Sequence, residues 1–179
     1  MKSVLLPFLA TLATASVLTA AEAPSSFPVG EFHFRRPATW GWVETTSAMR
    51  KAQLKVEAPG IAGSGEVIFF HFGPSNGGGT PANVQRWLGQ FDEKGDALKS
   101  KVEEATVRGR KITYVRAEGT YQSGLPGGPK TPQPNTMLLG AIVESPEGSV
   151  FIRFTGPAAL GKAAEADFRK LAESGIPGA

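Results

Sequence analysis

Cysteine is absent from this sequence of 179 residues. The chain therefore forms no disulfide bond, carries no thiol redox centre and offers no cysteine ligand to a metal. We expect no lipid anchor either, because the lipid of a bacterial lipoprotein is attached to a cysteine. The hydrophobic core alone has to stabilise the fold.

Histidine is scarce, since the chain has only His33 and His71. A zinc or copper site needs three or four converging ligands. These two histidines on neighbouring strands, completed by Glu31 or Glu66, are the one candidate, and the alternative for His71 is a histidine at the core edge with one hydrogen bond. A Ser/His/Asp triad would need one of the same histidines, and the serines lie in turn-like segments. We therefore expect no catalytic residues and no cofactor.

Positive charge is in only small excess. The formal net charge is +3, and the basic residues are spread along the chain. Nucleic-acid binders gather Lys and Arg on one face, so we expect no nucleic-acid partner. The glycine-rich segment 73–79 is similar to a phosphate loop, but glycine stands where that loop has its lysine. We interpret the segment as a connection from a strand to a helix.

The longest apolar run lies at the N-terminus. Val4 to Val17 follows a positive start and precedes Ala21-Glu22-Ala23, which is the pattern of a secretory signal and is too short for a comfortable membrane span. We predict a signal peptide over residues 1–23, cleaved after Ala23, with cleavage after Ala20 or Ala21 as alternatives. The mature protein is then exported, to the periplasm or beyond, and keeps no integral membrane segment.

After a flexible leader over 24–30, residues 31–176 are predicted to form a single domain. Short apolar runs between glycine- and proline-rich turns predict strands over 32–34, 53–57, 66–72, 102–107, 111–121, 137–143 and 150–154. Because the turns are too short for crossovers, the sheet should be predominantly antiparallel. Residues 122–136 have almost no apolar content and are predicted to be a surface loop that either docks a partner or is a tolerated insertion.

Two helices are predicted. The first begins at Thr80 and ends near Gly95, because Val84, Trp87, Leu88 and Phe91 recur at helical spacing on one face. The second runs from Gly156-Pro157 to a stop at Gly175. Together with strands that are apolar on both faces, the two helices predict an α+β sandwich with a helix on each side of one sheet.

Several segments of the chain resemble a family of uncharacterised exported bacterial proteins. The segments that carry the resemblance, in chain order, are Trp42–Arg50, Asn83–Trp87 with Gln90-Phe91, Glu118–Tyr121, Leu139–Glu144 and Phe151–Pro157. The architecture of that family is similar to the fold of the photosystem II extrinsic protein PsbP and of a nuclear Ran-binding factor. The resemblance implies a PsbP-like sandwich over roughly residues 28–176. It implies binding of other proteins more than chemistry, and no catalytic residues.

A recognition surface is the remaining candidate site. Asn83, Arg86 and Gln90 lie three and four residues apart, so they form one polar stripe beside the buried face of the first helix. Such a surface would combine this stripe with the loop 73–79 and Trp40 or Trp42. The structural alternative is that Arg86 pairs with a carboxylate and that the amides hold loops in place.

The functional hypotheses follow in order. The first is an exported, non-catalytic binding or assembly module for an unknown envelope protein. The second is a metal- or small-ligand-binding envelope protein that uses His33 and His71, and the third is a hydrolase.

Overall fold

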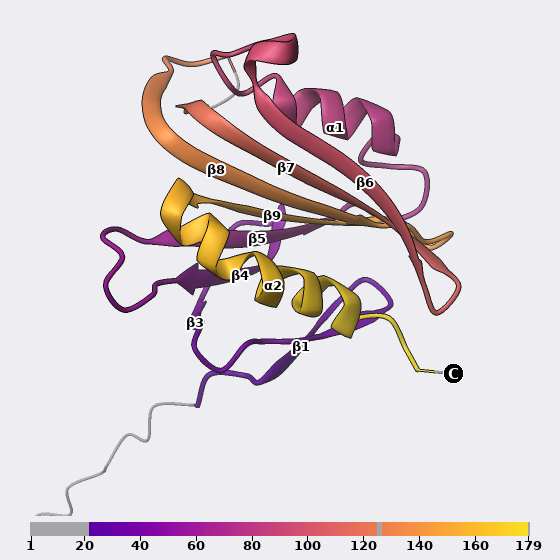
Figure 1. The fold of residues 1–179 in the computed structure, drawn as a ribbon. Helices are drawn as coiled ribbons and strands as arrows, with labels where there is room; N and C mark the ends of the chain where they lie inside the picture. Colours follow the sequence, from indigo (N-terminus) through magenta and orange to yellow (C-terminus); the bar gives the residue numbers. More distant parts are fainter. Residues whose placement is uncertain (1–21, 125–126, 179) are drawn as a thin grey trace, which may run out of the picture.

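The computed structural model describes residues 22–124 and 127–178, so most of the predicted signal peptide over 1–23 lies outside the described residues. Two sheets and two α-helices make up this part of the chain (Figure 1). The strands are β1 (Ser26–Val29), β2 (Phe32–Arg35), β3 (Gly41–Val43), β4 (Arg50–Val56), β5 (Gly65–His71), β6 (Lys99–Val107), β7 (Arg110–Ser123), β8 (Thr131–Val143) and β9 (Val150–Pro157). The helices are α1 (Thr80–Leu88) and α2 (Ala158–Ser174), with a short 3-10 helix at Gly95–Ala97.

The main sheet has seven strands in the order β3-β4-β5-β9-β8-β7-β6. Every neighbouring pair in it is antiparallel. The hairpins β6–β7 and β8–β9 pair as the sequence predicted, with turns too short for a crossover connection. The predicted class, α+β with a predominantly antiparallel sheet, is confirmed.

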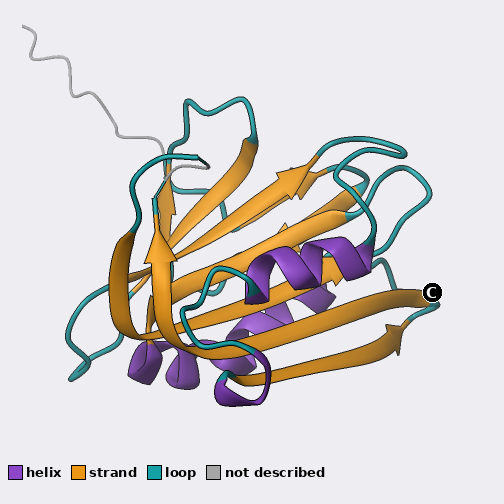
Figure 2. Ribbon diagram, turned by 90° about the horizontal axis from the view of Figure 1, so that it is seen from above, coloured by secondary structure: helices purple, strands orange, loops and turns teal. Residues whose placement is uncertain are grey.

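The two helices cover opposite faces of this sheet (Figures 1 and 2). Trp87 of α1 packs in one cluster with Leu138 of β8, whereas Phe168 of α2 packs in the other cluster with Leu139. Neighbouring positions along a strand point to opposite faces, so β8 contributes to both layers. The prediction of a helix on each side of the sheet is confirmed.

The N-terminal residues of the domain form a small sheet rather than a flexible leader. β1 pairs with β2 in a separate two-stranded sheet. The rings of Phe27 and Phe34 each lie 5.0 Å from the ring of Phe69, with which they share the core on the α2 face. The expectation of a flexible segment over 24–30 is therefore wrong, because alternate residues of β1 are buried against the main sheet.

The first helix is shorter than the sequence predicted. α1 ends at Leu88 with Gly89 as its C-cap, not near Gly95. Phe91, which the spacing assigned to the helix, is fully buried from the segment that follows it, where it forms a bridge with Tyr121. The second helix ends with Gly175 as its C-cap, as predicted.

The predicted loop over 122–136 is mostly strand. β7 continues to Ser123 and β8 begins at Thr131, and these ends pair with each other. We call this paired end, residues 120–124 and 127–136, the arm. The arm lies beyond the main core, so its strands need few apolar residues, and Pro132 and Pro134 are tolerated where a strand has an open edge.

Candidate functional site

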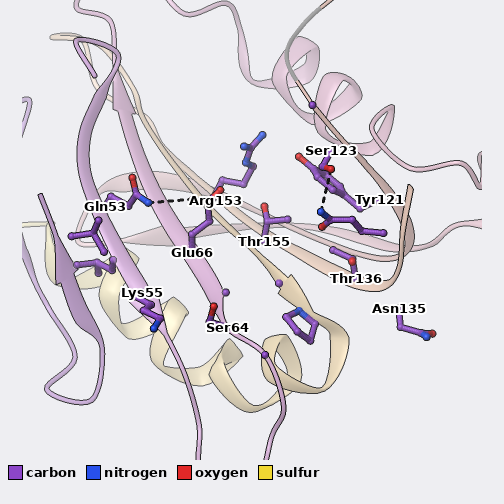
Figure 3. Close-up of a pocket in the computed structure, with 18 of the residues that line it drawn as sticks. Gln53, Lys55, Ser64, Glu66, Tyr121, Ser123, Asn135, Thr136, Arg153 and Thr155 are labelled. Atoms are coloured by element: carbon purple, nitrogen blue, oxygen red, sulfur yellow. Dashed lines mark hydrogen bonds between the residues drawn. The ribbon is translucent and has the colours of Figure 1, made fainter. Parts of the chain in front are cut away.

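A cleft of about 1090 Å³ lies on the α1 face of the sheet (Figure 3). Its floor is formed by β4, β5 and β9, and the arm forms the opposite wall. The cleft thus occupies the part of the α1 face that the helix does not cover. The lining side chains that carry charge are Arg50, Lys55, Glu66 and Arg153.

The arm bends where β8 carries an extra residue. The register shifts between Gly119 and Tyr121, so that the single residue Thr120 of β7 lies opposite two residues of β8, Pro134 and Asn135. The Glu93 carboxylate accepts two hydrogen bonds from the Thr120 backbone N–H, at 3.1 and 2.9 Å. These bonds from Thr120 are the main cause that lowers the pKa of Glu93 below its ordinary value.

The segment after α1 also holds the arm. The backbone N–H of Gln122 donates to the Gln90 carbonyl at 2.7 Å, and that of Asp92 donates to the Thr120 carbonyl at 2.9 Å. The ring of Tyr121 lies 5.5 Å from that of Phe91, edge to face. Backbone pairing and aromatic packing therefore tie the arm to the end of α1 and keep the cleft open.

The floor of the cleft contains one satisfied polar network. Arg50 donates from Nη1 to Gln53 Oε1 at 2.8 Å and lies 3.4 Å from Glu66 Oε2. Gln53 donates from Nε2 to the same Glu66 oxygen at 3.3 Å. Figure 3 shows Gln53 and Glu66 joined on neighbouring strands. The one carboxylate of the cleft is thus already neutralised by an arginine.

Arg153 extends from β9 towards the end of α1. Its Nη1 donates to Gln90 Oε1 at 3.2 Å. Its Nε is buried and has no hydrogen-bond partner among the described residues. An atom this buried is closed to a ligand in the cleft, so a further acceptor can reach only the outer part of this half-buried side chain.

The charges that line the cleft are three cations, Arg50, Lys55 and Arg153, against the single carboxylate of Glu66. No histidine belongs to the lining. Paired carboxylates, or a base next to a nucleophile, would be needed for most hydrolytic mechanisms. The arrangement of the described residues instead suits the binding of a polar or anionic group.

The predicted stripe on α1 has a structural role at its first residue. Asn83 is 1% exposed, and its Nδ2 donates to the carbonyls of Gly77, Gly78 and Gly79 at 2.8, 3.3 and 3.1 Å. Its Oδ1 accepts a hydrogen bond from Arg86, so the partner of Arg86 is an amide rather than a carboxylate. The amides hold loops in place, as the structural alternative stated.

The other two predicted binding residues are separated. Gln90 contacts Arg153 at the border of the cleft. Trp42 lies on the α2 face, where its ring is 5.2 Å from that of Phe27 and its Nε1 donates to Glu44 at 2.7 Å. The four residues Asn83, Arg86, Gln90 and Trp42 therefore do not form one surface.

The two histidines do not form a metal site. No group of three His, Asp or Glu side chains in residues 22–124 and 127–178 is placed to hold a metal ion. His33 is exposed on β2. His71 is half-buried at the end of β5 and makes one hydrogen bond, from Nε2 to the Glu147 carbonyl at 3.2 Å. His71 is thus a histidine at the edge of the core.

The segment Gly73-Pro74-Ser75-Asn76-Gly77 has the spacing Gly-x-Ser-x-Gly. Ser75 has a φ of 59°, a conformation that a catalytic elbow also uses. Its side chain is nevertheless exposed, it makes no hydrogen bond with either histidine, and α1 begins only at Thr80. The described geometry therefore does not make Ser75 a nucleophile.

Sequence reasoning missed the arginines of the cleft. Arg153 is a single charge between Ile152 and Phe154, and its strand parity was the available signal, since it occupies the face opposite to these buried neighbours. Arg50 precedes the predicted strand 53–57 and shares the parity of the buried Ala52 and Leu54, and it reaches the cleft only because the register of β4 shifts between Arg50 and Ala52. The segment 122–136, which the sequence suggested as a possible docking loop, does contribute to the site. Its residues Ser123 and Pro132–Thr136 line the cleft.

Comparison with protein-family models finds no match, and comparison with curated proteins finds none either. Among solved structures, the chain is similar to CyanoP, the cyanobacterial PsbP of Synechocystis, with a TM-score of 0.51 and 12% identity over 87% of this chain and 95% of CyanoP. It is also similar to PA94 from Pseudomonas aeruginosa, a protein of unknown function that has been suggested to be a regulator, with a TM-score of 0.50 and 14% identity over 86% of this chain and 96% of PA94.

At these identities the likeness shows the fold alone, which is a PsbP-like α+β sandwich. Membership of an exported bacterial family, which the sequence segments suggested, is not confirmed. Within the part of the chain that the structure describes, neither helix combines the length and the apolar character needed to cross a membrane.

Proposed function

We propose that this protein is an exported, non-catalytic binding or assembly module that contacts another envelope protein through the cleft. The observation that carries the proposal is the cleft itself, which is large and whose lining is richer in cations than in carboxylates. The shared fold does not decide the function, since one fold serves many roles. No feature of the described residues favours the metal site at His33 and His71 or a hydrolase.

Export is part of this proposal and is supported by the sequence. The folded domain is proposed to begin directly after the predicted cleavage site, because Arg36 donates from Nε to the Pro24 carbonyl at 2.8 Å. The full chain, expressed with a C-terminal tag in a Gram-negative host, should yield a periplasmic product whose intact mass starts at Pro24. Cleavage after Ala20 or Ala21 would give a start at Ala21 or Glu22. A full-length product confined to the cytoplasm would contradict export.

The use of the cleft can be tested by photo-crosslinking in the envelope. A benzophenone amino acid is placed at Ser64 or Asn135, which are exposed and line the cleft. Gln85 on α1 and Glu104 on β6 are exposed positions outside the cleft and serve as matched controls. We expect an adduct with the same envelope protein from both cleft positions and none from the controls. Equal adducts from all four positions, or adducts from the controls alone, would contradict the proposal.

A further inference from the structure

Building on the proposed function, we propose that the cleft binds an extended segment of the partner that carries acidic side chains. Four properties of the cleft favour this class of ligand: the charge of its lining, the state of its arginines, its size and lining, and the open edge of the arm.

The first property is the charge of the lining. Arg50, Lys55 and Arg153 give three positive charges against one negative charge on Glu66, which leaves 3 − 1 = +2 on the lining; Glu57 beside the lining pairs with Lys55 at 2.9 Å, and counting it leaves 2 − 1 = +1. A concave wall of one sign concentrates ligands of the opposite sign. An anionic segment would therefore be favoured over a neutral or cationic one.

The second property is the unequal satisfaction of the two arginines. Arg50 is engaged with Gln53 and Glu66. Arg153 is half-buried, is oriented by the neutral Gln90, and makes no ion pair with a carboxylate among the described residues. A carboxylate matches the guanidinium in geometry and charge, and charge-assisted hydrogen bonds are about twice as strong as neutral ones. Arg153 is thus the group for which an incoming carboxylate is the natural partner.

The third property is the size and lining of the cleft. Sites for drug-sized ligands usually have volumes of about 300–1,000 Å³ and mainly apolar linings. This cleft lies just above that range, with about 1090 Å³, and its lining is mixed: charged side chains of the floor stand beside prolines and glycines (Figure 3). An extended chain of several residues, with both apolar and anionic groups to place, fits these properties better than a compact apolar molecule does.

The arm also determines how such a segment is held. Over residues 131–135, at its start, β8 has no strand partner on the side away from β7 among the described residues. The reason is that β9 ends at Pro157, which lies opposite Thr136. Pro132 and Pro134 have no N–H to offer to a strand added there. Continuous backbone pairing is therefore interrupted, and the ligand is anchored by its side chains instead.

The inference is tested by fluorescence anisotropy on residues 24–179. The probe is a fluorescein-labelled peptide of alternating Glu and Ser, and its control peptide has Gln in place of every Glu. We expect tighter binding of the Glu peptide, weakened by added salt because the contacts are ionic. No histidine lines the cleft, so binding should change little between about pH 6 and 8.

Variants of the protein sharpen this test. The double variant R50Q/R153Q should weaken binding by about tenfold or more. The matched variant K51Q/K170Q removes the same charge outside the cleft and should change binding by less than about twofold. Two further single variants keep the test valid if R50Q/R153Q does not fold. K55Q should weaken binding, whereas E66Q, which frees Arg50 from its ion pair, should strengthen it.

Equal binding of the two peptides, or equal effects of the cleft and control variants, would overturn the inference. The peptide test and the crosslinking test distinguish a failure of this inference from a failure of the proposed function. If the cleft positions still crosslink to an envelope protein while the Glu peptide shows no preference, the acidic ligand is wrong and the binding function stands. If crosslinking fails as well, both are wrong.

Discussion

Asn83 shows how one buried amide organises the start of α1. No side chain caps this helix, whose N-cap is Gly79. Asn83 instead reaches back to three consecutive carbonyls of the loop 77–79. The glycines of that loop are needed for backbone shape, since Gly77 and Gly78 have φ values of 89° and 78°. The loop is therefore a structural element and not a phosphate site.

Replacing Asn83 with Ala should destabilise the protein. The substitution removes the three hydrogen bonds that the buried amide donates to the loop carbonyls, which together contribute about 1–3 kcal/mol. We expect the free energy of unfolding, measured in urea, to fall by about that amount. Gln85→Ala, at an exposed position of the same helix, is the control and should change it by less than about 0.5 kcal/mol. An Asn83→Ala protein as stable as this control would contradict the assignment.

Gly140 makes room for the helix at the centre of the sheet. A Cβ at this position would overlap the ring of Trp87, which is 3% exposed. Gly140→Ala should therefore push α1 away from β8, with a loss of stability of about 1–3 kcal/mol. The matched substitution Gly41→Ala, whose Cβ would lie 3.6 Å from that of Lys55, should be nearly neutral. Near-ultraviolet circular dichroism reports the tryptophan environment, and an unchanged spectrum for Gly140→Ala would contradict this packing.

At the scale of elements, the irregular pairing of β7 with β8 at Thr120 and the segment after α1 depend on each other. Glu93 holds Thr120 through both carboxylate oxygens. Two other carboxyls also have a lowered pKa, Glu103 chiefly through Lys101 and Glu118 chiefly through Lys162. Each of them lies on, or contacts, the edge of the sheet formed by β6 and β7.

These shifts predict acid sensitivity. A carboxyl whose pKa is lower in the folded state contributes stability above its ordinary value, here 4.5, and loses it as the pH falls through the folded value. The urea midpoint should therefore decrease below about pH 4.5. Glu93→Gln should be less stable at pH 7 and lose less on acidification. Glu57→Gln, where the carboxylate pairs with Lys55 at 2.9 Å on the surface, should keep the original profile. A Glu93→Gln profile parallel to the original would contradict the account.

Sequence periodicity predicted the elements of this fold well where one face of an element is buried. The strand 66–72 and the last helix are examples, because their apolar residues repeat with the period of the structure. Periodicity failed at the arm, whose strands are stabilised by backbone pairing and carry exposed polar residues and prolines. It also failed at Phe91, which kept helical spacing although the chain leaves the helix at Gly89.

The candidate site was less predictable than the fold. Arg50, Glu66 and Arg153 lie far apart in the chain and meet only because the strand order places β4, β5 and β9 side by side. A single sequence indicates which face of a strand a residue occupies, but not which strands are neighbours. The stripe on α1 was visible because its residues are local, and its first member proved to be structural.

At the scale of the whole molecule, one face of the sheet is closed and the other is partly open. The α2 face is covered by α2 and by the small sheet β1–β2 (Figure 1). The α1 face is covered only by α1 and the segment after it, so the cleft remains between the floor and the arm. The open part carries the cationic excess, which is why we assign binding to this side.

An NMR titration with the Glu-Ser peptide tests this claim most directly, because it reports every backbone amide of residues 24–179 at once. The account predicts that chemical-shift changes concentrate on the cleft, at residues 50–55, 64–66, 121–123, 131–136 and 153–156, and that the Gln-Ser peptide produces few of them. Changes centred on α2 or on β6, or changes spread evenly over the molecule, would show that the cleft is not the binding surface.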